Sequence, residues 1–148
     1  MENFSASIPV EILLVEDSPI DIKLTSKTFA NAKVMNNLHI VEDGVEAMDF
    51  LHQRGKYLDV PRPDLILLDL NLPKKDGRQV LSEIKAEPNL CLIPVVVLTT
   101  SEQEEDILRS YKLAANCYIT KPVTLKDFIQ VVEMIEGFWL TVVKLPHI

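Results

Sequence analysis

The chain has little of what would place it in a membrane, on nucleic acid or in an oxidising compartment. Its two cysteines, Cys91 and Cys117, show no metal-ligand spacing, so we expect both to be reduced core residues. No segment approaches the roughly 20 apolar residues of a membrane-spanning helix, and the start MENFSASIPV lacks the regions of a signal peptide. A net charge of −7, without clustered lysine and arginine, argues against nucleic acid. These absences predict a soluble cytoplasmic protein with neither a nucleic-acid nor a membrane partner.

What is present is typical of a globular domain. Apolar residues make up 47% and charged residues 25% of 148 residues, enough for one domain with a sizeable core. Short apolar runs alternate with amphipathic segments, which predicts a doubly wound α/β fold with a parallel sheet covered on both faces. The five predicted strands are residues 12–15, 38–41, 65–68, 95–98 and 117–119.

Five amphipathic helices are predicted between and after these strands. Ser18 suits the N-cap of the first, with Pro19 at the first helical position and Asp21 two residues further on. Thr124 and Asp127 form the signature of a capping box at the start of the last. The predicted core-facing residues are Ile22, Thr25 and Phe29; Val45, Met48 and Leu51; Val80, Leu81 and Ile84; Ile107, Leu108 and Tyr111; and Leu125, Phe128, Ile129, Val132 and Ile135.

Polar residues follow the carboxyl ends of four predicted strands, where doubly wound sheets bind their ligands. Glu16 and Asp17 follow the first strand, Asp69 the third, Thr99 the fourth and Lys121 the fifth. Two like charges about 4 Å apart repel by roughly 4 kcal/mol at an effective dielectric near 20, so clustered acids need a cation. Oxygen ligands without imidazole or thiolate favour Mg²⁺, for which Mn²⁺ can substitute.

The same residues suit phosphoryl transfer. Asp69 is placed to be a nucleophile, and Lys121 and the Thr99 hydroxyl could each bind a phosphoryl oxygen. Less specific interpretations stay open: Asp69 could cap a turn, Lys121 could be a surface residue, and Thr99 could merely end its strand.

Other functions also remain possible. An aspartate-nucleophile Mg²⁺ phosphatase would want a second acid two residues after Asp69, where Asn71 stands. A pocket for a nucleotide or flavin would want glycine after the first strand, where the sequence is acidic. A binding module that no longer accepts phosphate is a further alternative.

The motifs together resemble the receiver domain of two-component response regulators. They are "ILLVEDS", "LILLDLNLP", "VVVLTTS" and "YITKPV", in this order and each at a strand end. The resemblance implies a five-stranded flavodoxin-like sheet of order 2-1-3-4-5 with five helices. It also implies a phosphohistidine of a sensor histidine kinase as phosphoryl donor, and no catalysis beyond self-phosphorylation and slow dephosphorylation. The implied residue roles are Asp69 as phosphoacceptor, Glu16, Asp17, Asp69 and the Asn71 carbonyl as metal ligands, Thr99 and Lys121 as phosphoryl-binding residues, and Thr99 and Tyr118 as the switch pair.

Two further segments look like those of small response regulators that pair with phytochrome histidine kinases. They are "HQRGKYLDVPRPDLILLDLNLPKKDGR" and "GFWLTVVKLP". We expect an N-terminal tail over residues 1–10 and one receiver domain over 11–148, without an output domain. Residues 137–148 form an apolar extension that either folds back onto its own domain or, as we expect, is covered in a homodimer. The candidate interface residues are Phe138, Trp139, Leu140 and Val143.

Overall fold

Five parallel strands form one sheet, in the spatial order β2-β1-β3-β4-β5. The computed structural model describes residues 9–32, 35–99, 117–121, 123–124, 126–127 and 129–130. The predicted strands are all present, and β1 takes in Val10, the last residue of the expected tail. The strands are β1 (Val10–Val15), β2 (Asn36–Val41), β3 (Leu65–Asp69), β4 (Val95–Thr99) and β5 (Cys117–Thr120).

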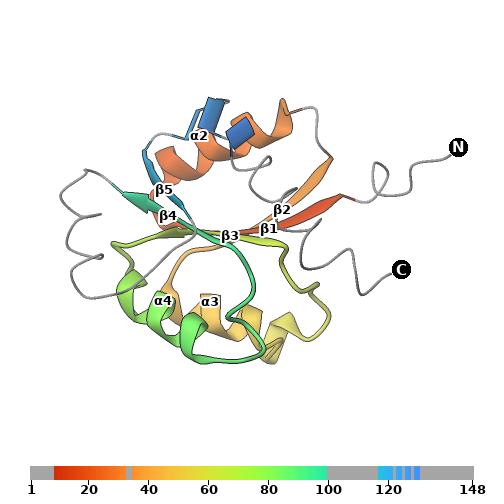
Figure 1. Cartoon of the computed structure of the whole chain (residues 1–148), viewed down its shortest axis with the longest axis vertical. Coiled ribbons are helices and arrows are strands. Elements are labelled where there is room, and N and C mark those ends of the chain that lie inside the picture. The colour runs from red at the N-terminus through yellow and green to blue at the C-terminus, as the bar shows by residue number, and fades with distance from the viewer. Residues whose placement is uncertain are drawn as a thin grey trace, which may run out of the picture.

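Helices cover both faces of this sheet. Figure 1 shows α2 on one side of the sheet and α3 and α4 on the other. This is the flavodoxin-like, doubly wound α/β fold that the sequence predicts. The helices are α2 (Pro19–Ala30), α3 (Gly44–Leu51) and α4 (Gly77–Ala86), and a short 3-10 helix, η1 (Gly55–Tyr57), lies between α3 and β3.

The sheet separates two hydrophobic clusters, because alternate residues of each strand face opposite sides. On the central strand β3 every residue is buried, which explains its unbroken apolar sequence. Leu65 and Leu67 pack with Phe29 of α2, whereas Ile66 and Leu68 pack with residues of α3 and α4. The site at the end of β3 therefore stands on a rigid, fully packed strand.

The predicted helix starts are confirmed at atomic level. The Asp21 backbone N–H donates to Ser18 Oγ at 3.3 Å, and Pro19 is the first helical residue of α2. At the last predicted helix, Thr124 N–H donates to Asp127 Oδ2 at 3.0 Å, and Asp127 N–H donates to Thr124 Oγ1 at 3.1 Å. Both ends satisfy backbone donors that a helix start leaves without partners.

Two predicted core positions are wrong. Val45 is 42% exposed and Ile129 is 51% exposed. In α3 the buried stripe begins one residue earlier, at Gly44, and continues through Ala47 and Met48, so Val45 falls on its border. Small residues carry part of this stripe, and they give little of the hydrophobic signal that predicts a core-facing position. The predicted positions Ile107, Leu108, Tyr111, Leu125, Phe128, Val132 and Ile135 lie outside the described residues.

Within the described part of the chain, no helix combines the length and apolar character needed to cross a membrane.

Candidate functional site

Three acidic side chains meet at the carboxyl edge of the sheet. Oxygen atoms of Glu16, Asp17 and Asp69 all lie within 4.8 Å of one another. Glu16 and Asp69 are only 1% and 3% exposed, while Asp17 is open to solvent. The structure thus brings together the three carboxylates that sequence analysis singled out, two of them buried and one at the surface.

Asp69 is held at the end of β3 by its neighbours. Its Oδ1 accepts a hydrogen bond from the Asn71 backbone N–H at 3.3 Å. Gly77 starts α4 so close to the strand that an added Cβ would lie 2.3 Å from the Asp69 carbonyl oxygen and 2.6 Å from Leu70 Cα. Only glycine allows this approach, so the glycine of the "KKDG" stretch fixes α4 against the site.

Lys121 is the cation of the site. Its Nζ donates to Asp69 Oδ2 at 3.2 Å and to Glu16 Oε2 at 3.4 Å, although β4 lies between β3 and β5. A third bond, of 3.1 Å, joins Nζ to Asp21 Oδ2 in the first turn of α2. The sequence pattern indicates Asp21 only as part of a helix start. Its place one turn after Asp17, on a helix that begins at the site, was the available indication.

Burial and neighbouring charges shift the pKa values of both Glu16 and Lys121. Burial, together with the hydrogen bond and negative charge of Asp69, raises the pKa of Glu16 to about 7, although the Ser18 N–H and Lys121 oppose this. Burial alone would lower the pKa of Lys121, but the hydrogen bond to Asp21 and the charges of Asp69 and Glu16 raise it above its usual value. The ammonium is therefore firmly charged, while the carboxylates remain under-compensated.

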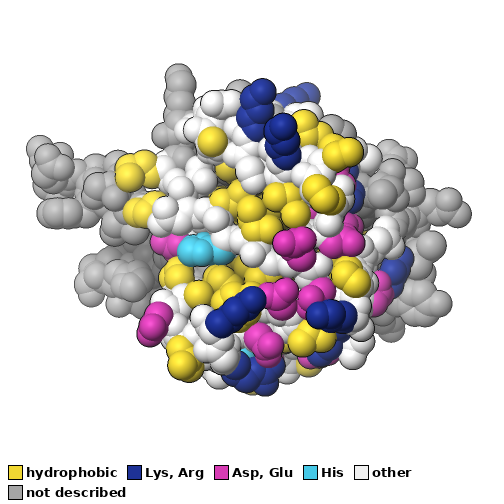
Figure 2. All heavy atoms as spheres, turned by 180° about the vertical axis from the view of Figure 1, so that it is seen from behind, with side chains coloured by type: hydrophobic (Ala, Val, Ile, Leu, Met, Phe, Trp, Pro, Cys, Tyr) yellow, Lys and Arg dark blue, Asp and Glu magenta, His cyan; other side chains and the backbone are white. Residues whose placement is uncertain are grey.

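The site has more acidic groups than basic groups, whereas ion pairs on the surface of the protein are balanced. Figure 2 shows acidic side chains near the middle of one face, with lysine and arginine side chains among and around them. Surface ion pairs such as Lys75–Glu83, at 2.8 Å, match one base with one acid. At the site one ammonium serves Glu16, Asp21 and Asp69. Oxygen-only donors with surplus negative charge fit a hard divalent cation.

The other predicted residues have less defined places. Thr99 ends β4, in register with Thr120 of β5. Tyr118, on β5, is half-buried against the cluster on the α3 and α4 side of the sheet. Asn71 is exposed just after β3, and the metal-binding role of its carbonyl stays a prediction. The predicted interface residues Phe138, Trp139, Leu140 and Val143 lie outside the described residues.

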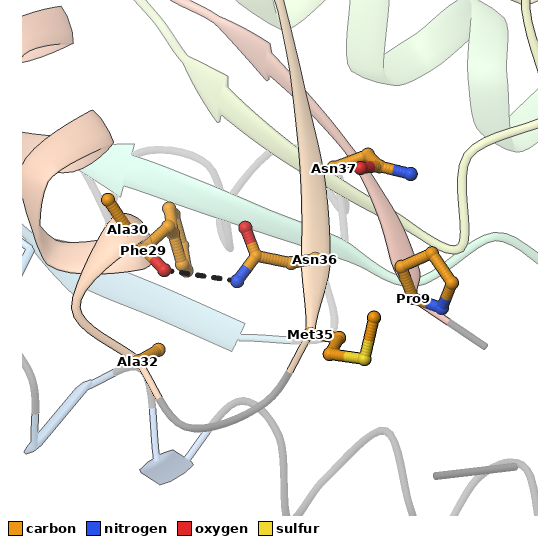
Figure 3. Close-up of a pocket in the computed structure, with 7 residues that line it drawn as sticks. All are labelled: Pro9, Phe29, Ala30, Ala32, Met35, Asn36 and Asn37. Atoms are coloured by element: carbon orange, nitrogen blue, oxygen red, sulfur yellow. Dashed lines mark hydrogen bonds between the residues drawn. The ribbon is translucent and has the colours of Figure 1, made fainter. Parts of the chain in front are cut away.

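A hollow of about 290 Å³ lies away from these residues, beside the start of β2. Figure 3 shows its lining, in which the Asn36 side-chain amide donates to the Phe29 carbonyl oxygen at 3.1 Å. None of its seven lining residues carries a charge, so it offers neither a carboxylate for a metal ion nor a cationic side chain for a phosphate. The lining residues are Pro9, Phe29, Ala30, Ala32, Met35, Asn36 and Asn37.

Comparison with known proteins agrees with this geometry. The response regulator receiver domain matches residues 12–133. Response regulator Rcp1 of Synechocystis sp. (strain ATCC 27184 / PCC 6803 / Kazusa) is 55% identical over 138 residues, which cover 93% of this chain and 94% of Rcp1.

Two solved structures extend the comparison to the fold. The phosphorylated cyanobacterial phytochrome response regulator RcpA has a TM-score of 0.73 at 55% identity, covering 90% of this chain and 95% of RcpA. The Mn²⁺-bound form of Rcp1 has a TM-score of 0.71 at 55% identity, covering 91% of this chain and 97% of that structure. With its match over most of its length, its sheet order and its acidic edge, the chain belongs to the response regulator receiver domain family.

Proposed function

We propose that this chain is a cytoplasmic phosphoacceptor response regulator, in which Asp69 accepts a phosphoryl group from a phosphohistidine of a sensor histidine kinase. The observation that carries the proposal is the setting of Asp69. Its carboxylate is buried, lies among two further acids and is bound by Lys121 at 3.2 Å. A structural acid would be better placed with one partner or in water, whereas this crowding is useful when a metal and a phosphoryl group join it.

In the transfer, one oxygen of the Asp69 carboxylate attacks phosphorus. The new O–P bond forms as the P–N bond of the donor breaks, and the imidazole leaves with the electron pair. Lys121 and the Thr99 hydroxyl bind phosphoryl oxygens. Glu16, Asp17, Asp69 and the Asn71 carbonyl would hold the divalent ion, which supplies positive charge to the phosphoryl oxygens.

We assign this ion as Mg²⁺. The site offers only oxygen ligands, and the exposed Asp17 leaves room for water, which Mg²⁺ retains. Mn²⁺ accepts similar ligands, and a Mn²⁺-bound structure exists for Rcp1.

Phosphorylation switches the protein through charge. The phosphoryl group adds nearly two negative charges, which draw Thr99 and Lys121 inward and let Tyr118 take the space that is vacated. The changed surface shifts an equilibrium between partner-binding states. Signalling thus proceeds by protein contact, and the only chemistry of the chain is its own phosphorylation and slow dephosphorylation.

We infer that the donor is a phytochrome-type kinase. RcpA, 55% identical to this chain, is a cyanobacterial phytochrome response regulator. Phosphotransfer from a panel of histidine kinases tests this. We expect a phytochrome kinase to transfer fastest, and equal transfer from unrelated kinases would contradict the assignment.

We further propose that residues 11–148 form one receiver domain and act as a homodimer. The apolar extension 137–148 would form the interface through Phe138, Trp139, Leu140 and Val143. Trp139→Glu should shift the mass in light scattering from dimer to monomer. A wild-type monomer at all concentrations would contradict the dimer.

Incubation with acetyl phosphate and Mg²⁺ tests the central proposal. We expect intact mass spectrometry to find one labile phosphoryl group per chain, and none on Asp69→Asn. Asp64→Asn is the matched control, since Asp64 immediately precedes the same strand and should leave phosphorylation unchanged. Turnover of many equivalents would instead indicate a phosphatase, and the absence of an adduct would indicate a phosphorylation-independent binding module.

A further inference from the structure

Asp21 binds the same ammonium group as the proposed phosphoacceptor. Lys121 Nζ lies 3.1 Å from Asp21 Oδ2 and 3.2 Å from Asp69 Oδ2. The third contact, to Glu16 Oε2, is longer, at 3.4 Å. An ammonium group has three N–H donors, and three carboxylates are within reach of them. A phosphoryl oxygen would therefore have to compete with carboxylates that already bind Lys121.

Among these three carboxylates, Asp21 is the outer one. Its side chain in the ion pair is 27% exposed, compared with 1% for Glu16 and 4% for Asp69. The other two belong to the cluster of three acids that could hold a metal ion, but Asp21 is not part of it. Asp21 thus binds Lys121 from the more exposed side of the site.

The backbone holds Asp21 in this place. It lies in the first turn of α2, where its N–H donates to Ser18 Oγ at 3.3 Å. Ser18 in turn donates its own N–H to Glu16 Oε1 at 3.2 Å. A negative charge in the first turn is also favoured by the helix dipole. Asp21 is consequently a fixed anchor, which phosphorylation of Asp69 would not remove.

We propose that Asp21 is a positioning residue. It holds Lys121 toward the more exposed side of the site and so weakens the binding of Lys121 to the phosphoryl group of Asp69. This inference rests on the proposed function of Asp69 as phosphoacceptor. Because phosphorylation of Asp69 leaves the Asp21 side chain in place, Asp21 competes with the phosphoryl oxygens for Lys121 before and after transfer. The strength of phosphoryl binding is then set partly by a residue that belongs neither to the proposed metal ligands nor to the proposed phosphoryl-binding residues.

Beryllium trifluoride, a tetrahedral phosphoryl analogue that binds carboxylates, tests this at equilibrium. With Mg²⁺ at saturation, we expect Asp21→Asn to bind the analogue about threefold to tenfold more tightly than wild type, in titrations followed by calorimetry or fluorine NMR. The substitution keeps the shape of the side chain and removes its charge. If Asp21 only supported the start of α2, the variant would bind equally or more weakly, and either result would overturn the proposal.

Three further variants separate positioning from general charge effects. Asp21→Glu keeps the charge and should bind within about twofold of wild type. Asp49→Asn removes a charge on α3 that pairs with Arg54 at 3.2 Å, and this variant should bind like wild type. In a Lys121→Met background, Asp21→Asn should not tighten the binding of the analogue. An equal gain there would mean that Asp21 acts by direct repulsion and would overturn a role through Lys121.

The outcomes also separate this inference from the proposed function. If wild type fails to bind the analogue, or Asp69→Asn binds it equally well, the phosphoacceptor role of Asp69 is wrong. If wild type binds, Asp69→Asn does not, and Asp21→Asn shows no gain, only the role of Asp21 is wrong.

Discussion

Strands β1 and β3 carry an acid near each end, and the two ends of this pair of strands differ sharply. At the amino ends, Asp64 Oδ2 accepts the Glu11 backbone N–H at 2.9 Å, and the Glu11 carboxylate contacts His39 Nε2 at 2.8 Å. At the carboxyl ends, Glu16 and Asp69 are almost fully buried and share one ammonium. The same residue types thus have matched hydrogen-bond partners at the amino edge, whereas at the carboxyl edge their negative charge exceeds the positive charge beside them.

The direction of the helices accounts for this difference. In a parallel α/β sheet the helices begin near the carboxyl ends of the strands, as α2 does at Pro19 and α4 at Gly77. Helix starts carry unpaired N–H groups and partial positive charge, which favour anions. The carboxyl edge therefore favours a cluster of acids more than the amino edge does, and this surplus of negative charge is what a divalent cation can use.

Among variants that test the difference between the two edges, Gly77→Ala should lower the free energy of unfolding the most. The new Cβ would lie 2.3 Å from the Asp69 carbonyl oxygen, so α4 or the end of β3 must move. We expect a loss of about 3 kcal/mol in the free energy of unfolding, measured in urea, with impaired phosphorylation. Gly55→Ala is the control. Gly55 has a φ of +60° but open space around it, so alanine should cost about 1 kcal/mol and leave phosphorylation intact.

Lys121→Met should have the next largest effect, because it leaves the buried acids without their ammonium. Removing one partner of a fully buried ion pair costs 3–5 kcal/mol, and partial exposure of Lys121 reduces our expectation to about 2 kcal/mol. The measurement is urea unfolding in EDTA, and Mg²⁺ should restore part of the loss. Lys75→Met, which breaks a more exposed pair with Glu83, should cost less than about 1 kcal/mol and be insensitive to Mg²⁺. Equal losses of unfolding free energy in the two variants would show that the ammonium at the site is no more important for stability than one at the surface.

Sequence pattern predicted the strands and the polar residues at their carboxyl ends, because both are local features of the sequence. Unbroken apolar runs mark buried parallel strands, and the order of strands places Glu16, Asp69 and Lys121 at one edge. Val45 was misplaced because Gly44 and Ala47 carry the buried stripe of α3, and small residues give little hydrophobic signal.

The contact between Asp21 and Lys121 was harder to predict. It joins residues 100 positions apart, and it depends on the reach of the lysine side chain across β4. Residue spacing places Asp21 near the site, but only the folded structure shows that it shares the ammonium. The strands and the polar residues at their ends thus follow from sequence pattern and the strand order from the family resemblance, while the sharing of one cation among several acids requires side-chain geometry.

The smallest change in the free energy of unfolding should come from Asp64→Asn, at the amino edge. Burial raises the pKa of Asp64 above its usual 3.8, despite the hydrogen bond from the Glu11 N–H. The folded protein therefore binds this proton more tightly than the unfolded chain, and stability falls as the pH rises from the usual pKa through the raised one. Asparagine can accept the same bond without the charge. We expect a gain of at most about 0.5 kcal/mol at pH 7 because solvent screens this group, and no gain near pH 3, where the carboxyl is protonated in both states. Chemical unfolding at the two pH values measures this, and a loss at pH 7 would show that the acid at the amino edge needs its charge after all.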